Sequence, residues 1–573
     1  MLAHRYPADG AARSATSHSP DFRKAVIFIN AMAGSDYIVC AMLPFLTGVL
    51  THQGLFRRFE LDRYPLQVAS ASILLYLTLV QVHGFSSYAH APYTTAFAQF
   101  ASFFLGLCLS TAVHRAAFHP LKRFPGPFAA RLSKFWAVSQ AARTRGSWYK
   151  FNHELHTKYG DYVRVGPREL SITDPDAIPP ILGPSARTSK GPFYGSLEQS
   201  VHTTLDKEFH RQRRRVWDNG FKFALVDFAP RIEAATDELL SVLAQSSRSG
   251  LPVDFKDTIQ RYSFDVMCTL AFGEPMGYLT GKTTAQDESI FKSIHDSLDM
   301  IALFVHTPWI IKIMEVCSVI PGPIKRLNDW SATKVGLRKK MKNPQPDIIG
   351  HLMKHTQDDA KGQNLLNAES RLIIGAGSDT AAGALAMIFA YLANHPSHTS
   401  ALRAELLTAF ATNTCSCLRP LPLLDATINE VLRLHPPVTW ASSRVTPADG
   451  LRIPNKNIHL PPNTIVSLPP CGVMRDPRNF VDPHAFRPER WTTRPELVKN
   501  KVAFMPFLMG PYACPGKGLA MMEIRCAVAR CVERFEVVWE EDLGLGEWLQ
   551  GVKDHFTMGV PRCRLGFRER GGV

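Results

Sequence analysis

The residues best suited to chemistry lie near the C-terminus, in the loop Phe507-Leu-Met-Gly510-Pro-Tyr512-Ala-Cys514-Pro-Gly516. Cys514 stands just before a helical pattern, where the helix dipole and backbone N–H groups stabilise a thiolate. Gly510 and Gly516 let the backbone approach a flat ligand closely. Phe507 can cover the sulfur and keep water from a metal. The loop predicts a soft metal ligand; the alternative is one of eleven cysteines buried for packing.

A second chemical stretch lies inside a long apolar helical pattern at 369–394. It reads Gly375-Ala376-Gly377-Ser378-Asp379-Thr380. Glycines in a helix interior cost about 1 kcal/mol each relative to alanine, and Asp and Thr compete for backbone hydrogen bonds. Such a run favours a local widening of the helix beside a small ligand, with a hydroxyl and a carboxylate to relay protons. The alternative is a packing glycine beside a polar stripe.

Two further sets of residues can support a site. Glu430 and Arg433 are three apart and share a helix face before a proline pair, and Arg490 follows in a second short motif. His210 and Arg214 are four apart on one face of a basic helix. Taken alone, a basic run is usually a solvated helix face.

The elements that must position these residues are mostly helical. Residues 254–356 show helical apolar spacing, and 369–394 is the long helix already described. Residues 161–173 alternate apolar and polar side chains around a Gly-Pro turn, which predicts a β-hairpin.

These motifs, in this order, resemble the cytochrome P450 family over about residues 120–565. F-x-x-G-x-x-x-C-x-G is that family's heme-ligand signature, A-G-x-D-T its oxygen-activation motif, and E-x-x-R with a later arginine its buried network. The resemblance is closest to fungal microsomal members of secondary metabolism or xenobiotic oxidation. It implies a mainly α fold with small β-sheets, the heme-thiolate fold, preceded by N-terminal transmembrane helices.

The resemblance also implies a role for each residue. Cys514 would be the axial ligand of the iron of heme b, Asp379 and Thr380 would control proton delivery, and the network would be structural. The expected heme contacts are Cys514, Phe507, Gly510, Gly516, His210, Arg214, Arg444, Ala376 and Gly377. The expected network is Glu430, Arg433 and Arg490, and the expected substrate contacts are Val438, Trp440 and Ala441.

Tyr512 departs from the family pattern. Many members carry Arg or His two residues before the cysteine, as a partner of a heme propionate. A phenol can donate a hydrogen bond but brings no positive charge. We therefore expect His210, Arg214 and Arg444 to carry more of the heme anchoring.

The implied activity is a monooxygenase that uses O2 and NADPH-derived electrons to oxidise a lipophilic small molecule. The electrons would come from a separate NADPH–cytochrome P450 reductase, with cytochrome b5 as a further candidate, because the chain shows no dinucleotide fingerprint. Two alternatives stay open: a heme-thiolate isomerase or dehydratase that needs no O2, and a non-catalytic heme-binding membrane protein. The acid–alcohol pair Asp379-Thr380 argues against both.

Composition bounds the partners and the compartment. The formal net charge of +15 suits an anionic membrane surface or an acidic protein, and no nucleic-acid-binding signature is visible. The cysteines are odd in number and scattered through a long chain, which favours reduced thiols facing the cytosol over a disulfide framework.

The first 120 residues are expected to form a membrane anchor. Residues 94–113 and 66–83 are uncharged and about long enough to span a bilayer. Residues 26–50 contain Asp36, and a carboxylate in hydrocarbon costs roughly 3 kcal/mol, so this stretch is expected at the interface and two spans are preferred over three. Arg57, Arg58 and Arg63 precede the second stretch, which places residues 121–573, the catalytic domain, on the cytosolic side of the endoplasmic reticulum membrane.

Overall fold

The computed structural model describes residues 41–58, 64–84, 92–317, 319, 322–342, 344–412, 419–439 and 442–570. The chain divides into two compact units, Met1–His114 and Arg115–Val573.

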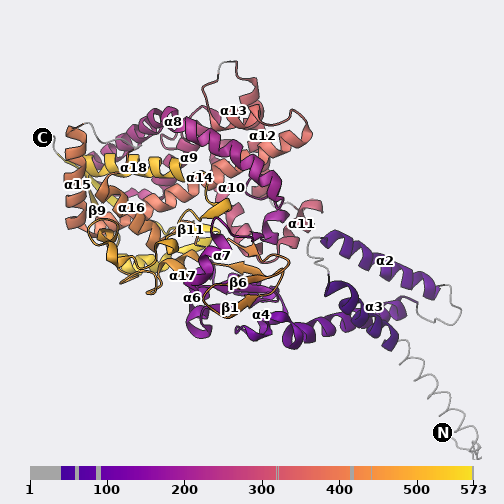
Figure 1. Ribbon diagram of the computed structural model, residues 1–573. Helices are drawn as coiled ribbons and strands as arrows, with labels where there is room; N and C mark the ends of the chain where they lie inside the picture. Colours follow the sequence, from indigo (N-terminus) through magenta and orange to yellow (C-terminus); the bar gives the residue numbers. More distant parts are fainter. Residues whose placement is uncertain are drawn as a thin grey trace, which may run out of the picture. The chain divides into compact units, whose positions relative to one another are not determined.

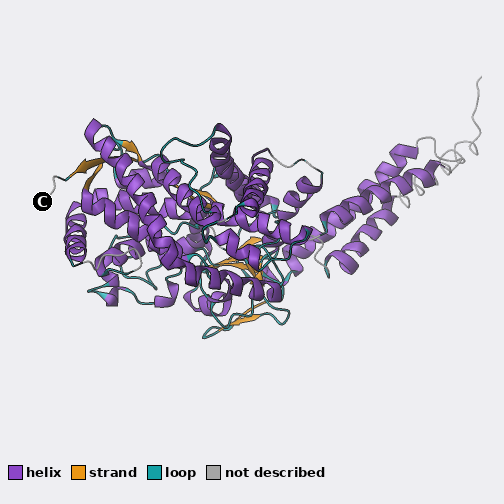
Figure 2. Cartoon of the chain, turned by 90° about the horizontal axis from the view of Figure 1, so that it is seen from above, coloured by secondary structure: helices purple, strands orange, loops and turns teal. Residues whose placement is uncertain are grey.

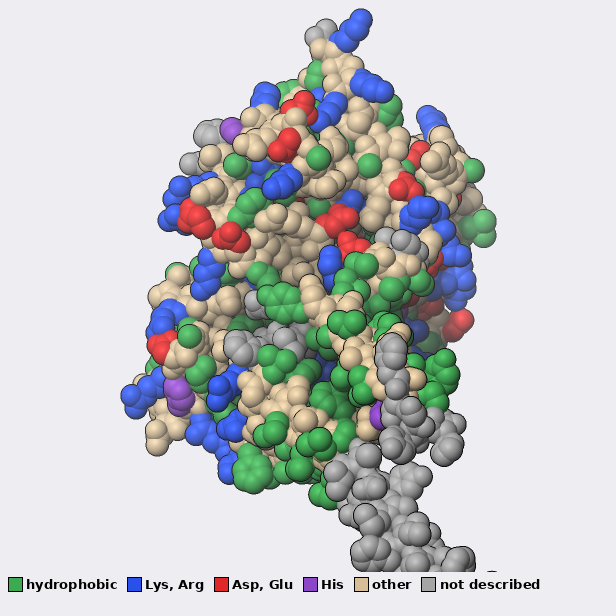
Figure 3. All heavy atoms as spheres, turned by 90° about the vertical axis from the view of Figure 1, so that its right-hand side faces the viewer, with side chains coloured by type: hydrophobic (Ala, Val, Ile, Leu, Met, Phe, Trp, Pro, Cys, Tyr) green, Lys and Arg blue, Asp and Glu red, His purple; other side chains and the backbone are tan. Residues whose placement is uncertain are grey.

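The first unit contains two long apolar helices, α2 (Pro65–Gly84) and α3 (Pro92–Val113). Both are long and apolar enough to cross a membrane, with mean hydropathies of 1.5 for Pro65–Gly84 and 1.7 for Pro92–Phe118. Ile73, Leu74 and Leu77 of α2 are 53–66% exposed, as expected for side chains that face lipid. Hydrophobic side chains also gather densely over the lower part of the face seen in Figure 3.

Residues 41–51 form a further helix, followed by the π-helical turn His52–Phe56. This helix packs tightly against α3. The Ser102 hydroxyl donates to the Ala41 carbonyl at one end of the contact, and His52 Nδ1 lies 2.8 Å from Ser110 Oγ at the other. Because the contacts advance along both segments together, the two helices run parallel.

Glycines bring these two backbones together. A Cβ at Gly48 would collide with the backbone of Phe103, and a Cβ at Gly106 would collide with the backbone of Phe45. Small residues at such contacts are typical of helices that pack inside membranes.

The second unit is mainly helical with small sheets, as predicted (Figure 2). Its largest sheet has the strand order β1-β2-β8-β5-β3. The strands are β1 (Tyr162–Gly166), β2 (Glu169–Ile172), β3 (Ser189–Lys190), β5 (Arg444–Val445) and β8 (Ile465–Ser467). The predicted hairpin at 161–173 is confirmed, because β1 and β2 pair antiparallel. The pairing of β3 with β5 places Lys190 opposite Arg444.

The remaining strands form one three-stranded sheet and two hairpins. The sheet has the order β4-β12-β9, with β4 (Val253–Asp254), β9 (Phe535–Trp539) and β12 (Arg564–Glu569). The hairpins are β6 (Leu451–Ile453) with β7 (Ile458–Leu460), and β10 (Lys553–His555) with β11 (Thr557–Gly559).

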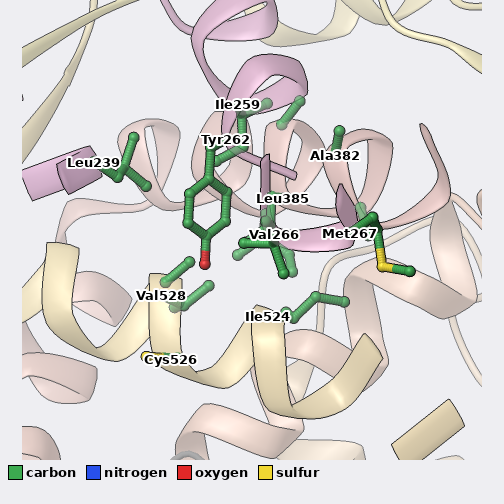
Figure 4. Packing of buried hydrophobic residues seen from close by; sticks show 14 of the residues in the cluster. Leu239, Ile259, Tyr262, Val266, Met267, Ala382, Leu385, Ile524, Cys526 and Val528 are labelled. Carbon is green, nitrogen blue, oxygen red and sulfur yellow. The ribbon is translucent and has the colours of Figure 1, made fainter. Parts of the chain in front are cut away.

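Four helices build the core around which the site is arranged (Figure 1): α8 (Lys207–Ser249), α9 (Phe255–Phe272), α14 (Ala360–Asn394) and α18 (Lys517–Arg534). Their buried faces meet in one large hydrophobic cluster. Figure 4 shows Tyr262 and Val266 of α9 between Leu385 of α14 and Val528 of α18.

Other helices surround this core. They are α4 (Phe128–Leu132), α5 (Phe135–Arg143), α6 (Trp148–Tyr159), α7 (Ile178–Leu182), α10 (Ala285–Phe304), α11 (Pro308–Val316), α12 (Gly322–Lys340), α13 (Ile348–Lys354), α15 (Pro396–Ala411), α16 (Pro422–Leu434), α17 (Pro470–Met474) and α19 (Leu545–Trp548).

Helix α14 differs from the expectation in two respects. It begins at Ala360, nine residues earlier than predicted, because the Asp359 side chain caps it by accepting from the Gly362 N–H. It is also continuous through 375–380, so the predicted widening is not present as a break in the helix. The Thr380 hydroxyl donates to the Ala376 carbonyl at 2.6 Å, which keeps the polar side chain within the helix.

Candidate active site

The cysteine loop is held in a tight turn between a 3₁₀ helix (Gly510–Tyr512) and α18. The Cys514 N–H donates to the Phe507 carbonyl at 2.8 Å, which closes the loop. Gly510 has φ +68°, and a Cβ there would collide with the carbonyl oxygens of Leu182 and Gly183. Only glycine fits this position.

The Cys514 side chain is exposed, yet protein surrounds its thiol closely enough that burial raises the pKa of the thiol. This combination is expected of a thiol at the floor of a recess. The backbone N–H groups of Gly516 and Lys517 and the charge of Arg214 act in the opposite direction and favour the thiolate. Phe507 is half-buried beside the loop, with the Lys517 ammonium 5.9 Å from its ring centroid.

Basic side chains gather around Tyr512. Lys190 Nζ lies 5.1 Å and the Arg444 guanidinium carbon 4.9 Å from its ring centroid, and the His210 ring centroid is 4.8 Å away. Burial and the charges of Arg444 and Arg214 lower the pKa of Lys190 to about 7. Burial and the charges of Lys190, Arg214 and Arg444 lower the pKa of His210 to about 4.

Among the described residues, no carboxylate pairs with Lys190 or Arg444, and the buried Arg444 Nε has no hydrogen-bond acceptor. Arg214, by contrast, is paired with Asp218. Buried charges are normally paired. A group that brings a soft-ligand metal to Cys514 and carboxylates to this cluster fits the residues present, and heme b has both features.

Helix α8 contacts both the cysteine loop and α14. The Arg214 guanidinium donates to the Ala513 carbonyl, next to the cysteine. One residue before it, Arg213 forms a buried bidentate pair with Glu369 of α14, and Trp217 Nε1 donates to the same carboxylate at 3.1 Å. The face of α8 that carries His210 and Arg214 therefore contacts the cysteine loop. The face that carries Arg213 and Trp217 contacts α14.

Helix α14 presents a short accessible stripe in an otherwise buried stretch. Ala376 is exposed and Thr380 half-buried, one turn apart, whereas residues 381–390 are all buried. Gly377 also has a packing role, and its expected heme contact stays a prediction. A Cβ there would lie 2.6 Å from Met267 Cε, so the glycine lets α9 pack closely against α14.

Asp379 is held by two residues from other elements. Its Oδ2 accepts from the Thr557 hydroxyl of β11, and its Oδ1 lies 3.5 Å from His295 Nε2 of α10. The Asp379 side chain is 9% exposed, and that of His295 is 37% exposed.

The structure brings Glu430, Arg433 and Arg490 together in a fully buried cluster. Arg433 donates to both oxygens of Glu430 at 2.8 and 2.9 Å, and Arg490 Nε donates to Oε1 at 3.0 Å. Trp491 Nε1 adds a further hydrogen bond to Glu430 Oε2 at 3.0 Å. Both guanidiniums also donate to neighbouring backbone carbonyls, and these hydrogen bonds, with the bidentate pairing of Arg433 to Glu430, make the buried charges tolerable.

Of the expected substrate contacts, Val438 is half-buried, whereas Trp440 and Ala441 lie outside the described residues. Thr439 and Ser443, on either side of these two residues, line a pocket with about 490 Å³ of empty space, open solvent included. Trp148 and Tyr149 of α6 line another part of it.

Sequence reasoning missed Lys190, His295 and Thr557. Lys190 reaches Tyr512 only because β3 pairs with β5, and Thr557 reaches Asp379 only through the β10–β11 hairpin. No local motif marks any of the three. The net positive charge of the sequence is the one signal that bears on Lys190, and it does not single out a residue.

Comparison with known proteins gives concordant matches. The family model described as cytochrome P450 matches residues 125–544. A cytochrome P450 monooxygenase of Aspergillus versicolor is 35% identical over 547 residues, which cover 92% of this chain and 98% of that protein.

Two other fungal relatives extend the comparison. A cytochrome P450 monooxygenase of Eupenicillium brefeldianum is 37% identical over 486 residues, 83% of this chain and 97% of that protein. The tryprostatin B 6-hydroxylase of Aspergillus fumigatus is 33% identical over 538 residues, 90% of this chain and 94% of that protein.

Proposed function

This chain belongs to the cytochrome P450 family, and we propose that Cys514 is the axial iron ligand of its heme and that the catalytic unit works at the endoplasmic reticulum membrane. The enzyme is a monooxygenase of the type found in fungal secondary metabolism, which uses O2 and reductase-derived electrons to oxidise a lipophilic small molecule. When bound, the heme supplies oxygen activation, and a thiolate ligand donates electron density to its iron.

The positive cluster around Tyr512 carries this proposal. Lys190, His210 and Arg444 would meet the heme carboxylates, and Arg214 would hold both a carboxylate and the cysteine loop. The cluster compensates for Tyr512, which brings no charge of its own. Its support is the set of buried cations without a carboxylate partner among the described residues.

On the other side of the recess, α14 would offer Thr380 and Asp379. The Thr380 hydroxyl donates to the Ala376 carbonyl, so its oxygen is left as a hydrogen-bond acceptor on the accessible stripe. Asp379, one residue earlier, would exchange protons with the interior of the site. Glu430, Arg433 and Arg490 would act only by holding the fold behind the cysteine loop.

The ligand assignment can be tested spectroscopically in the purified full-length enzyme. The reduced carbon monoxide complex should absorb at the position typical of thiolate ligation, and Cys514→Ala should abolish that band. Cys317→Ala, at an exposed cysteine after α11, is the matched control and should keep it. A histidine-type band in the wild type, or a thiolate band in Cys514→Ala, would overturn the assignment.

A second experiment separates the monooxygenase from the isomerase and the non-catalytic alternative. Full-length enzyme reconstituted with NADPH–cytochrome P450 reductase is tested against a panel of lipophilic compounds that shift its heme spectrum. Product formation should require O2, NADPH and the reductase together. Turnover in their absence would indicate an isomerase, and no turnover of any binding compound would favour a non-catalytic protein.

We further propose that the first unit anchors the enzyme with its second unit in the cytosol. If α3 ends at the cytosolic face, the parallel helix 41–51 also runs toward the cytosol and delivers Arg57 and Arg58 there, as the positive-inside rule requires. Helix α2 would then return to the lumen. A glycosylation acceptor inserted at residues 85–91 should be modified, and one inserted after residue 120 should not.

Electrons would enter on the side of the cysteine loop. Lys207, Arg211 and Arg215 are exposed on α8, and Lys517 is exposed at the start of α18. These cations suit an acidic flavoprotein such as NADPH–cytochrome P450 reductase, or cytochrome b5. Reduction of the heme should then slow as ionic strength rises, because salt screens exposed charges.

A further inference from the structure

The carboxylate of Asp379 lies beside a more exposed titratable side chain, His295. Asp379 is nearly buried, whereas more than a third of the His295 side chain is exposed, and the two approach at 3.5 Å between Oδ1 and Nε2. The other carboxylate oxygen is occupied by the Thr557 hydroxyl. His295 is therefore the titratable group between Asp379 and solvent.

The imidazole of His295 is oriented by its own helix. Its Nδ1 lies 3.1 Å from the Phe291 carbonyl, one turn earlier in α10, and a carbonyl can only accept. Nδ1 therefore carries a proton in both charge states of the ring. The proton that comes and goes is the one on Nε2.

Two partners share Nε2. Gln260 Nε2 of α9 lies 2.9 Å away and Asp379 Oδ1 lies 3.5 Å away. When the ring is neutral, Nε2 accepts from the Gln260 amide. When it is protonated, Nε2–H donates to Asp379, and a half-turn of the amide presents the Gln260 oxygen instead. The same atom thus has a partner for each protonation state.

The charges around His295 come from two elements. Burial lowers the pKa of His295 and the charge of Lys256 on α9 lowers it further, but the hydrogen bond and charge of Asp379 on α14 outweigh both and leave the pKa raised above 6.5. Asp379 therefore favours the protonated form of the ring.

We propose that His295 is a positioning residue that supplies protons to Asp379 during turnover, with Gln260 as its partner in the neutral state. The imidazolium gives its Nε2 proton to Asp379 Oδ1 and becomes neutral, and a hydronium ion from solvent restores the proton. No electrons move and no other bond changes. This inference rests on the proposed function, because it concerns the residue through which Asp379 is reprotonated.

The competing explanation is that His295 only holds α10 in place. Helix α10 has an independent tie to the β10–β11 hairpin, the ion pair of Asp299 with His555. A merely structural His295 would lend stability, but it would not give the enzyme a pH dependence of its own.

The first test measures the pKa of His295 directly in the full-length holoenzyme. Diethyl pyrocarbonate modifies neutral imidazole, and mass spectrometry of the peptide gives the rate at His295 as a function of pH. The midpoint should lie above 6.5, fall by about one pH unit in Asp379→Asn, and rise in Gln260→Leu. His351 on α13 serves as the internal control. An unchanged midpoint at His295 in Asp379→Asn would overturn the proposal.

The second test uses the substrate-free oxidase reaction with NADPH–cytochrome P450 reductase, so no substrate need be known. The wild-type rate of NADPH consumption should fall as pH rises through the His295 midpoint. His295→Gln should be about tenfold slower, show a larger solvent isotope effect and lose that pH limb. A His295→Gln enzyme with the wild-type pH profile would refute the relay.

The experiments distinguish a failure of the Cys514 ligand assignment from a failure of the His295 proposal. The reduced carbon monoxide spectrum of each variant reports whether the heme is bound through a thiolate, so a failure of the ligand assignment appears there. His295→Asn provides a second variant if His295→Gln does not fold. The chemical modification midpoint does not depend on activity at all.

Discussion

The ammonium nitrogen of Lys190 lies 5.1 Å from the centroid of the Tyr512 ring, two residues before the cysteine. Lys190 also donates to the carbonyls of Val201 and His202 at 2.8 and 2.6 Å. The pairing of β3 with β5 brings Lys190 to Tyr512, where it supplies the basic group that the cysteine loop itself lacks.

Lys190→Met should weaken heme retention. A hydrogen bond to a charged group is worth about 1.5–3 kcal/mol, so heme loss to excess apomyoglobin should accelerate about tenfold or more. Lys207→Met is the matched control, since Lys207 is exposed on α8. Equal heme loss in both variants would remove Lys190 from the cluster.

Glu523 should make stability pH-dependent. Burial raises its pKa to about 8, with only the Ser263 hydroxyl opposing the shift. Because the folded state holds this proton more tightly than the unfolded state, stability is greatest below pH 4.5 and is lost as pH rises toward 8.

Glu523→Gln removes this loss, so the variant should gain about 2–4 kcal/mol relative to wild type between about pH 5 and about pH 8. The measurement is the difference in thermal midpoint at the two pH values. Glu536→Gln, at an exposed glutamate of β9, should show no such difference.

Substitutions at two glycines of α14 should change the free energy of unfolding in opposite directions. Gly377→Val should cost about 1–3 kcal/mol, because the new side chain collides with Met267, and Met267→Ala should recover part of the loss. Gly375→Ala should gain up to about 1 kcal/mol, since a Cβ there meets nothing within 4 Å. Urea titration of each variant gives the free energy of unfolding.

Removing the shared carboxylate of Glu430 from the buried network should strongly destabilise the fold. Glu430→Ala strands two buried guanidiniums and should cost about 3–5 kcal/mol, read as loss of folded, heme-binding protein. Glu496→Ala breaks an exposed pair with Arg494 and should leave the yield of folded, heme-binding protein unchanged, because exposed ion pairs add little stability. Similar costs for the two would show that burial does not decide the effect.

Thr380→Ala should divert turnover toward peroxide. The ratio of hydrogen peroxide released to NADPH consumed should rise severalfold in the reconstituted enzyme. Ser378→Ala is the control, because that hydroxyl is buried and donates to the Ile374 carbonyl. A peroxide ratio unchanged by Thr380→Ala would remove Thr380 from proton delivery.

Much of the fold can be predicted from local sequence patterns. The helical class and the hairpin at 161–173 follow from periodicity, and the two apolar N-terminal helices follow from uncharged stretches of sufficient length. The family's ordered motifs mark the cysteine loop and α14. The start of α14 was missed because Asp359, a simple N-cap, lies in a polar stretch without apolar periodicity.

The rest depends on tertiary pairing. Gly377 occupies a motif position, but the side chain that a Cβ there would meet is Met267, more than a hundred residues away, and no spacing rule connects them. His295 and Thr557 converge on Asp379 from a helix and a hairpin on opposite sides of it in sequence. Such contacts are set by how elements pack, which one sequence does not encode locally.

One turn of α8 mechanically couples the two walls of the recess. Arg214 holds the Ala513 carbonyl beside the cysteine, and its neighbour Arg213 holds Glu369 in α14. A displacement of the cysteine loop, such as a docked redox protein could impose, must therefore either break one of these bonds or shift α14 with it. Neighbouring residues of α8 thus tie the cysteine loop to α14.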